Sequence, residues 1–294
     1  IGEMSHDGNQ DSGPLVSSSH ATSAVRGTNY VGGLVGRMST ATVLDAYATG
    51  DVSGAQNVGG LVGTMDISDD AIEFVYDEED EPTRMLPIMI DAYATGSVTA
   101  TRNNVGGAVG ETQGAILTRV RASGTVTSHG DPTAGDSDGE DDGLNVGGLV
   151  GRATGEDGRS SEIPTLITDS ASTSAVSASE GWAVGGLIGR SMPAVIHHAS
   201  ATGSVHGKRA VGGLIGEIDD DPARPTRISS SWASGRVTGA TCIGGFAGIV
   251  RDTVRDAYAT GAVGSQGSGT AVGGFAGCAD DASITRVLAT GRVQ

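Results

Sequence analysis

Hydrophobic and polar positions alternate in a short element that recurs along the whole chain. It is clearest as DAYATG at Asp45–Gly50, Asp91–Gly96 and Asp256–Gly261, each followed by a valine two residues later. Alanine, glycine and valine then fall on one face of an extended chain, and the hydroxyl-bearing residues fall on the other. A period of two in residues rich in glycine and β-branched side chains predicts β-strands rather than helices.

Nine versions of this Ala–Thr/Ser–Gly–x–Val element can be aligned, and all nine end in valine. Alanine stands four residues before the valine in eight of them, Ser172 being the exception, and a threonine or serine always follows that position. Equivalent positions in repeated units stack on one another, so we expect a buried valine ladder. The ladder consists of Val25, Val52, Val98, Val126, Val176, Val205, Val237, Val263 and Val293.

A second element, VGGLVG, alternates with the first. Its eight copies begin at Val31, Val58, Val105, Val146, Val184, Val211, Ile243 and Val272. The closing glycine never varies, but the fourth and fifth positions change together. Leu–Val becomes Phe246–Ala247 in one copy and Phe275–Ala276 in the next. A larger residue beside a smaller one indicates that both positions share one tightly packed interior.

The spacing of the elements predicts the architecture. Successive copies lie as few as 27 residues apart, and longer spacings arise from insertions at 64–90, 127–145, 152–168 and 217–230. A short unit with insertions at fixed points is typical of a solenoid, whereas propeller blades need about 40 residues. We therefore predict an all-β fold, a β-solenoid (β-helix) of about nine coils in one domain, 1–294, each coil holding two or three strands. Coils stacked about 4.8 Å apart would form a rod of about 45 Å.

Both chain ends match the interior of a repeat. IGEM at Ile1–Met4 matches IGEI at Ile215–Ile218, and Val293–Gln294 stand where the next VGG element would begin. A solenoid without a cap leaves unpaired strand edges. We therefore expect the coils to continue in a longer chain, or to meet other copies end to end.

Composition narrows the classes of partner. The chain has 49 glycines, only 3% aromatic residues and a net charge of −17, and Lys208 is its single lysine. Nucleic-acid and anionic membrane surfaces both need a basic face, so neither is expected as a partner. No run of about 18 apolar residues exists, so we expect no membrane insertion. Acidity with almost no lysine is typical of proteins from halophiles, where salt screens the repulsion between carboxylates; an ordinary acidic secreted protein is the alternative.

The alternation of VGGLVG with DAYATGSV resembles the GLUG repeat of large bacterial and archaeal surface proteins, some of them adhesin-like or associated with cell walls. The resemblance extends from Ser17 to Val293. It implies an extracellular location and a structural or adhesive role, and it carries no catalytic residues. The chain departs from the family in having Asp45, Asp91 and Asp256 where asparagine is common, and in its acidic insertions.

Two insertions contain candidate sites. One has the carboxylate density of a calcium loop, but it lacks the spacing and the closing glutamate of an EF-hand, so a solvated surface loop is the competing interpretation. Its carboxylates are Asp136, Asp138, Glu140, Asp141 and Asp142. The other insertion contains Phe74 and Tyr76, which we consider as a contact surface; a small packing cluster is the alternative. No other cofactor is predicted.

The sequence does not predict a catalytic constellation. Asp45, Asp91 and Asp256 occupy one repeat position instead of forming a pair, and His197–His198 has no evident acidic or cysteine partner nearby. The outward column that contains Tyr47 is too irregular for an ice-binding array.

The two cysteines, Cys242 and Cys278, are expected to remain free thiols. In repeat register they lie seven residues apart, about 23 Å along an extended strand, which exceeds the reach of a disulfide. A bridge requires the glycines between them to fold the element back.

The sequence as a whole predicts a non-enzymatic structural or adhesive rod of an extracellular surface or filament protein. A fibre subunit that stacks its coils head to tail is one alternative, and a polysaccharide-active β-helix enzyme is another. Expected partners are further copies or a longer chain, and a cell-surface polysaccharide or protein.

Overall fold

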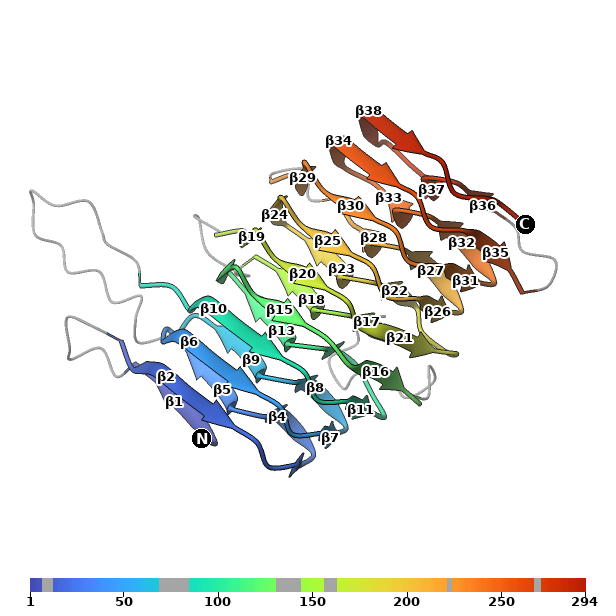
Figure 1. The fold of residues 1–294 in the computed structure, drawn as a ribbon. Helices are drawn as coiled ribbons and strands as arrows, with labels where there is room; N and C mark the ends of the chain where they lie inside the picture. The colour runs from blue at the N-terminus through green and yellow to red at the C-terminus, as the bar shows by residue number, and fades with distance from the viewer. Residues whose placement is uncertain (7–12, 69–84, 131–143, 156–162, 221–223, 267–270) are drawn as a thin grey trace, which may run out of the picture.

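The computed structural model describes residues 1–6, 13–68, 85–130, 144–155, 163–220, 224–266 and 271–294. Every regular element in these ranges is a β-strand, and every strand pairing is parallel (Figure 1). The strands form four sheets that run the length of the molecule, which confirms the predicted all-β solenoid.

Sheets A and B are the two larger sheets. Sheet A contains β1 (Glu3–Ser5), β5 (Val35–Ser39), β9 (Val62–Asp66), β13 (Val109–Gln113), β18 (Val150–Thr154), β23 (Ile188–Met192), β28 (Ile215–Ile218), β33 (Ala247–Val250) and β37 (Ala276–Ala279). Sheet B contains β2 (Leu15–Ala21), β6 (Thr42–Ala48), β10 (Ile88–Ala94), β14 (Ile116–Thr118), β15 (Arg121–Ala122), β19 (Thr165–Thr168), β20 (Ala171–Ser172), β24 (Ala194–His197), β25 (Ser200–Ala201), β29 (Arg227–Ser229), β30 (Trp232–Ala233), β34 (Thr253–Ala259) and β38 (Ser283–Ala289).

Sheets C and D are built from shorter strands. Sheet C contains β3 (Val25–Arg26), β7 (Val52–Gly54), β11 (Val98–Ala100), β16 (Thr125–Ser128), β21 (Ala175–Ala178), β26 (Val205–Gly207), β31 (Val237–Gly239) and β35 (Val263–Ser265). Sheet D contains β4 (Asn29–Gly32), β8 (Gln56–Gly59), β12 (Val105–Gly106), β17 (Asn145–Gly147), β22 (Ala183–Gly185), β27 (Arg209–Gly212), β32 (Thr241–Gly244) and β36 (Val272–Gly273).

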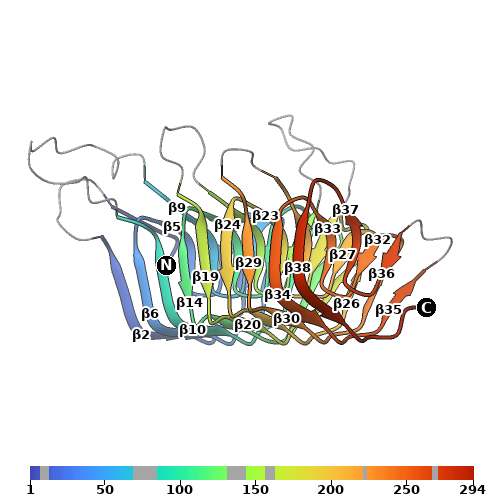
Figure 2. The ribbon, with the colours of Figure 1, turned by 90° about the horizontal axis from the view of Figure 1, so that it is seen from above.

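One coil visits the sheets in the order A, B, C, D and then enters sheet A again. The run β5, β6, β7, β8 is one such circuit, and β9 pairs with β5 to begin the next (Figures 1 and 2). The sequence predicted two or three strands per coil, whereas the circuit contains four. The difference arises because each repeated element is divided: Ala48 ends β6, a corner follows, and Val52 begins β7.

The ladder valines pair in register throughout sheet C. Val52 lies between Val25 and Val98, and the series continues through the sheet to Val263, which forms an isolated bridge with Val293. Stacked β-branched side chains suit a parallel sheet because each fills the space beside its neighbour.

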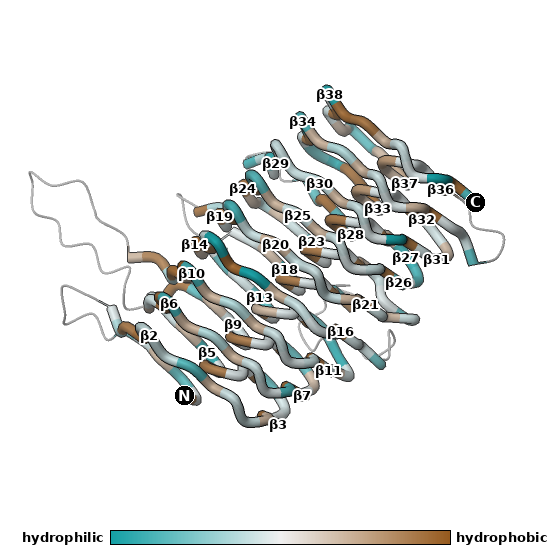
Figure 3. Tube along the Cα trace, viewed as in Figure 1, coloured by the Kyte–Doolittle hydropathy of each residue, from teal (hydrophilic) through white to brown (hydrophobic). Residues whose placement is uncertain are grey.

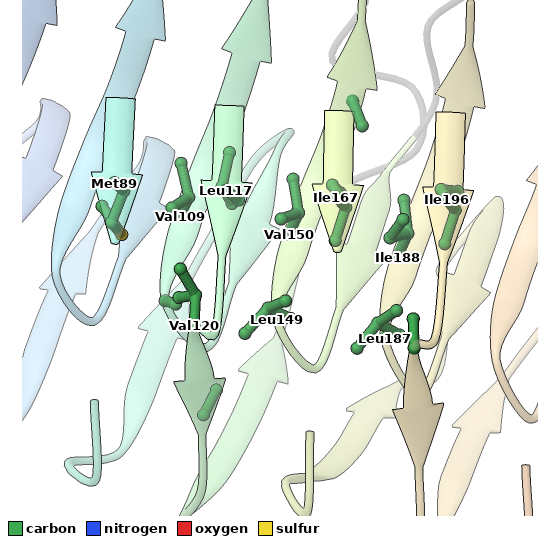
Figure 4. Packing of buried hydrophobic residues seen from close by; sticks show 14 of the residues in the cluster. Met89, Val109, Leu117, Val120, Leu149, Val150, Ile167, Leu187, Ile188 and Ile196 are labelled. Atoms are coloured by element: carbon green, nitrogen blue, oxygen red, sulfur yellow. The ribbon is translucent and has the colours of Figure 1, made fainter. Parts of the chain in front are cut away.

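The interior is divided into two apolar cores. The large core lies between sheets A and B; Figure 4 shows Val109, Val150 and Ile188 of sheet A beside residues of sheet B such as Leu117 and Ile167. The small core lies between sheets C and D and consists of valines, Ala100, Ala178 and Ile243.

Sheets A and D meet along a seam where the closing glycines of the VGGLVG elements leave no room for a Cβ atom. From Gly63 onward, each closing glycine lies against the backbone of sheet D in the preceding VGG element. A Cβ atom added to Gly189 would lie 2.6 Å from the backbone nitrogen of Val146. The chain therefore turns back on itself between sheets D and A. Among the described residues, no helix has the length and apolar character needed to cross a membrane.

Candidate interaction surface

The outer face of sheet B carries a regular bulge. One residue in each coil of this sheet has a left-handed backbone conformation, with φ between 46° and 54°. This bulge column consists of Ser18, Asp45, Asp91, Arg119, Asp169, His198, Ser230, Asp256 and Arg286. The left-handed residue between them allows Val43 and Ala46 both to point into the large core, although they lie three residues apart. Aspartate tolerates this backbone region better than most residues, which accounts for its repetition here.

Two of the repeated aspartates of the bulge column, Asp91 and Asp256, form ion pairs with arginines of the following coil. Arg119 donates two hydrogen bonds to Asp91, of 2.6 and 2.7 Å, and Arg286 does the same to Asp256 at 2.5 and 2.7 Å. These arginine hydrogen bonds lower the pKa of both carboxyl groups. A general acid needs the opposite shift of its pKa. An alignment of the repeats reveals the pairs, because each arginine occupies the aspartate's position in the following coil.

His197 and His198 do have an acidic neighbour, contrary to the expectation from sequence. The Nδ1 atom of His198 lies 3.5 Å from Oδ1 of Asp169, and Nδ1 of His197 lies 2.9 Å from Oγ of Ser229. Asp169 was missed because it belongs to the preceding coil. The part of the chain that the structure describes contains no group of three or more His, Cys, Asp or Glu residues that could hold a metal ion.

A second column on the same face contains stacked rings. It consists of His20, Tyr47, Tyr93, Arg121, Ala171, Ser200, Trp232, Tyr258 and Leu288. His20, Tyr47 and Tyr93 stack with ring centroids 4.9 Å apart, and Trp232 stacks on Tyr258 at 5.8 Å. Figure 3 shows that hydropathy changes over short distances along this face. This ring column is too irregular for an ice-binding array, because its two aromatic stacks are separated by smaller or polar residues.

Exposed hydroxyls border the ring column on its other side. They belong to residues two positions further along each coil, among them Thr49, Thr95, Thr173, Thr202 and Thr260. The outer face of sheet B therefore presents carboxylates, arginines, aromatic rings and hydroxyls in parallel columns. A surface of this kind can both donate and accept hydrogen bonds beside flat apolar groups.

The seam between sheets A and D contains a buried polar ladder. Asn145 donates to Asn104, and Asn104 donates to Asn57, each with an N···O distance of 3.1 Å. Asn57 in turn donates to Thr64 at 3.0 Å and to Glu111 of the following coil at 2.7 Å. These bonds give acceptors to the amide nitrogens of all three asparagines, which the close approach of the sheets removes from water.

The expectation of free thiols was wrong, because Cys242 and Cys278 form a disulfide with a Cα–Cα distance of 5.2 Å. The estimate of 23 Å assumed one extended strand, whereas the VGG element folds back between sheets D and A. Cys242 precedes its VGG element as Asn57 does. Cys278 occupies the column of Glu111. The disulfide thus occupies the place that the hydrogen bond from Asn57 to Glu111 has in an earlier coil.

The remaining predicted sites lie outside the described residues. These are the carboxylates Asp136, Asp138, Glu140, Asp141 and Asp142 of the acidic insertion, and the aromatic pair Phe74 and Tyr76.

Comparison with known proteins identifies a relationship to GLUG-repeat proteins. The family model described as the GLUG motif matches residues 27–53. The chain is 36% identical over 214 residues to Halomucin of Haloquadratum walsbyi (strain DSM 16790 / HBSQ001), an alignment that covers 68% of this chain. The chain spans only 2% of the length of that relative. No solved structure matches.

Proposed function

Because this chain is a GLUG-repeat protein, we propose that it forms a rod-shaped structural segment of a cell-surface or extracellular protein and acts without catalysis. The observation that carries the proposal is the continuous register of four parallel sheets along the rod. Each coil adds the same cross-section, so the length of the rod increases with the number of coils while its width stays constant.

The disulfide supports an extracellular location. Disulfides form and persist in oxidising compartments and are rare in the cytosol of most cells. The similarity to Halomucin points in the same direction. A net charge of −17 with a single lysine suits a protein that works at high salt, where carboxylates remain hydrated and their mutual repulsion is screened.

The chemistry of the described surface supports a non-enzymatic role. Asp91 and Asp256 are held in arginine ion pairs that keep them ionised, and they recur as one position of a repeat. Glycoside hydrolysis needs two carboxyl groups whose environments separate their pKa values, one of them raised. Asp91 and Asp256 lack that asymmetry, because the pKa of each is lowered by its arginine partner.

Electron microscopy of the purified chain over a range of potassium chloride concentrations tests the proposal. Isolated, unbranched rods at high salt are the expected result. Long filaments would instead favour a fibre subunit whose coils associate end to end. Compact particles under all conditions would contradict both forms of the proposal, because neither accommodates a globular arrangement of the coils.

A further inference from the structure

We draw no further inference here: the strongest candidate, the apolar pocket that Met85, Ile88 and Ile116 line at the corner between sheets A and B, carries no argument because nothing in the structure shows what covers it.

Discussion

The large core between sheets A and B and the small core between sheets C and D belong to the same coils, yet their residues differ. The large core contains fully buried methionine, leucine, isoleucine and phenylalanine side chains, including Met65, Leu149 and Phe246. The small core contains stacked valines with two alanines and Ile243. One chain therefore maintains a variable interior and a nearly uniform interior side by side.

The difference shows that the length of the facing strands determines how much the buried residues can vary from one coil to the next. Strands of sheets A and B direct several side chains into one space, so a larger residue can be offset by a smaller neighbour. Phe246 stacks on Phe275 with ring centroids 4.7 Å apart, and Ala247 follows where other coils have valine or isoleucine. Strands of sheets C and D contribute one or two residues each, so no neighbour is available to compensate.

The most damaging change should be one that forces the seam between the cores apart. In Gly189→Ala the new Cβ would lie 2.6 Å from the backbone nitrogen of Val146, so the sheets must separate. We expect the free energy of unfolding to fall by about 3 kcal/mol or more, the upper range for overpacking. Guanidinium-induced unfolding at fixed salt provides the measurement.

Gly264→Ala is the matched control for the seam, because its nearest neighbour would be Thr238 Cγ2 at 3.9 Å. It should unfold at nearly the same denaturant concentration as the wild type. Equal unfolding midpoints for both glycine variants would show that sheets A and D can separate without loss of stability. That result would contradict the division of the interior into two closed cores.

Truncation of one residue in each core compares the two directly. Leu187 belongs to the large core and Val184 to the small core, and both are fully buried in a single VGGLIG element. We expect Leu187→Ala to cost about 3 kcal/mol and Val184→Ala about 2 kcal/mol, because fewer methyl groups are lost. Denaturant unfolding of both variants gives the two values. A larger loss for Val184→Ala would mean that the small core dominates the stability of the rod.

The smallest effect should come from the surface, where charge contributes little compared with either core. The hydrogen bonds from Arg119 lower the pKa of Asp91, so this pairing stabilises the fold above the ordinary carboxyl pKa, and the contribution disappears as pH falls through the lowered value. In Arg119→Gln, an NMR titration of the Asp91 carboxyl should show a higher pKa, while Asp256, paired with Arg286, titrates as before. A change in both carboxyl groups would indicate a rearrangement of sheet B.

The repeat itself was visible in the sequence because both elements bury their side chains in the same way in every coil. Alternation around the invariant valines predicted strands, and the fixed spacing predicted a solenoid. The exchange of Leu–Val for Phe246–Ala247 correctly indicated a shared interior, since both residues are fully buried.

The features that were missed depend on contacts between coils or on backbone geometry. The disulfide of Cys242 requires the fold-back at the glycine-lined seam, which a linear distance cannot reveal. The left-handed bulge at Asp45 and its equivalents has only a weak sequence signal, because arginine and histidine occupy it too.

In a stack of parallel coils, the inter-strand hydrogen bonds point along the rod, so a pulling force on the two ends loads them coil by coil. Each coil that peels away releases its contour length and dissipates work. The bond between Cys242 and Cys278 spans 36 residues and keeps about 120 Å of chain out of that extension. Under tension the rod would therefore act as an extensible tether with one covalently locked section, in which oxidation sets the maximum length.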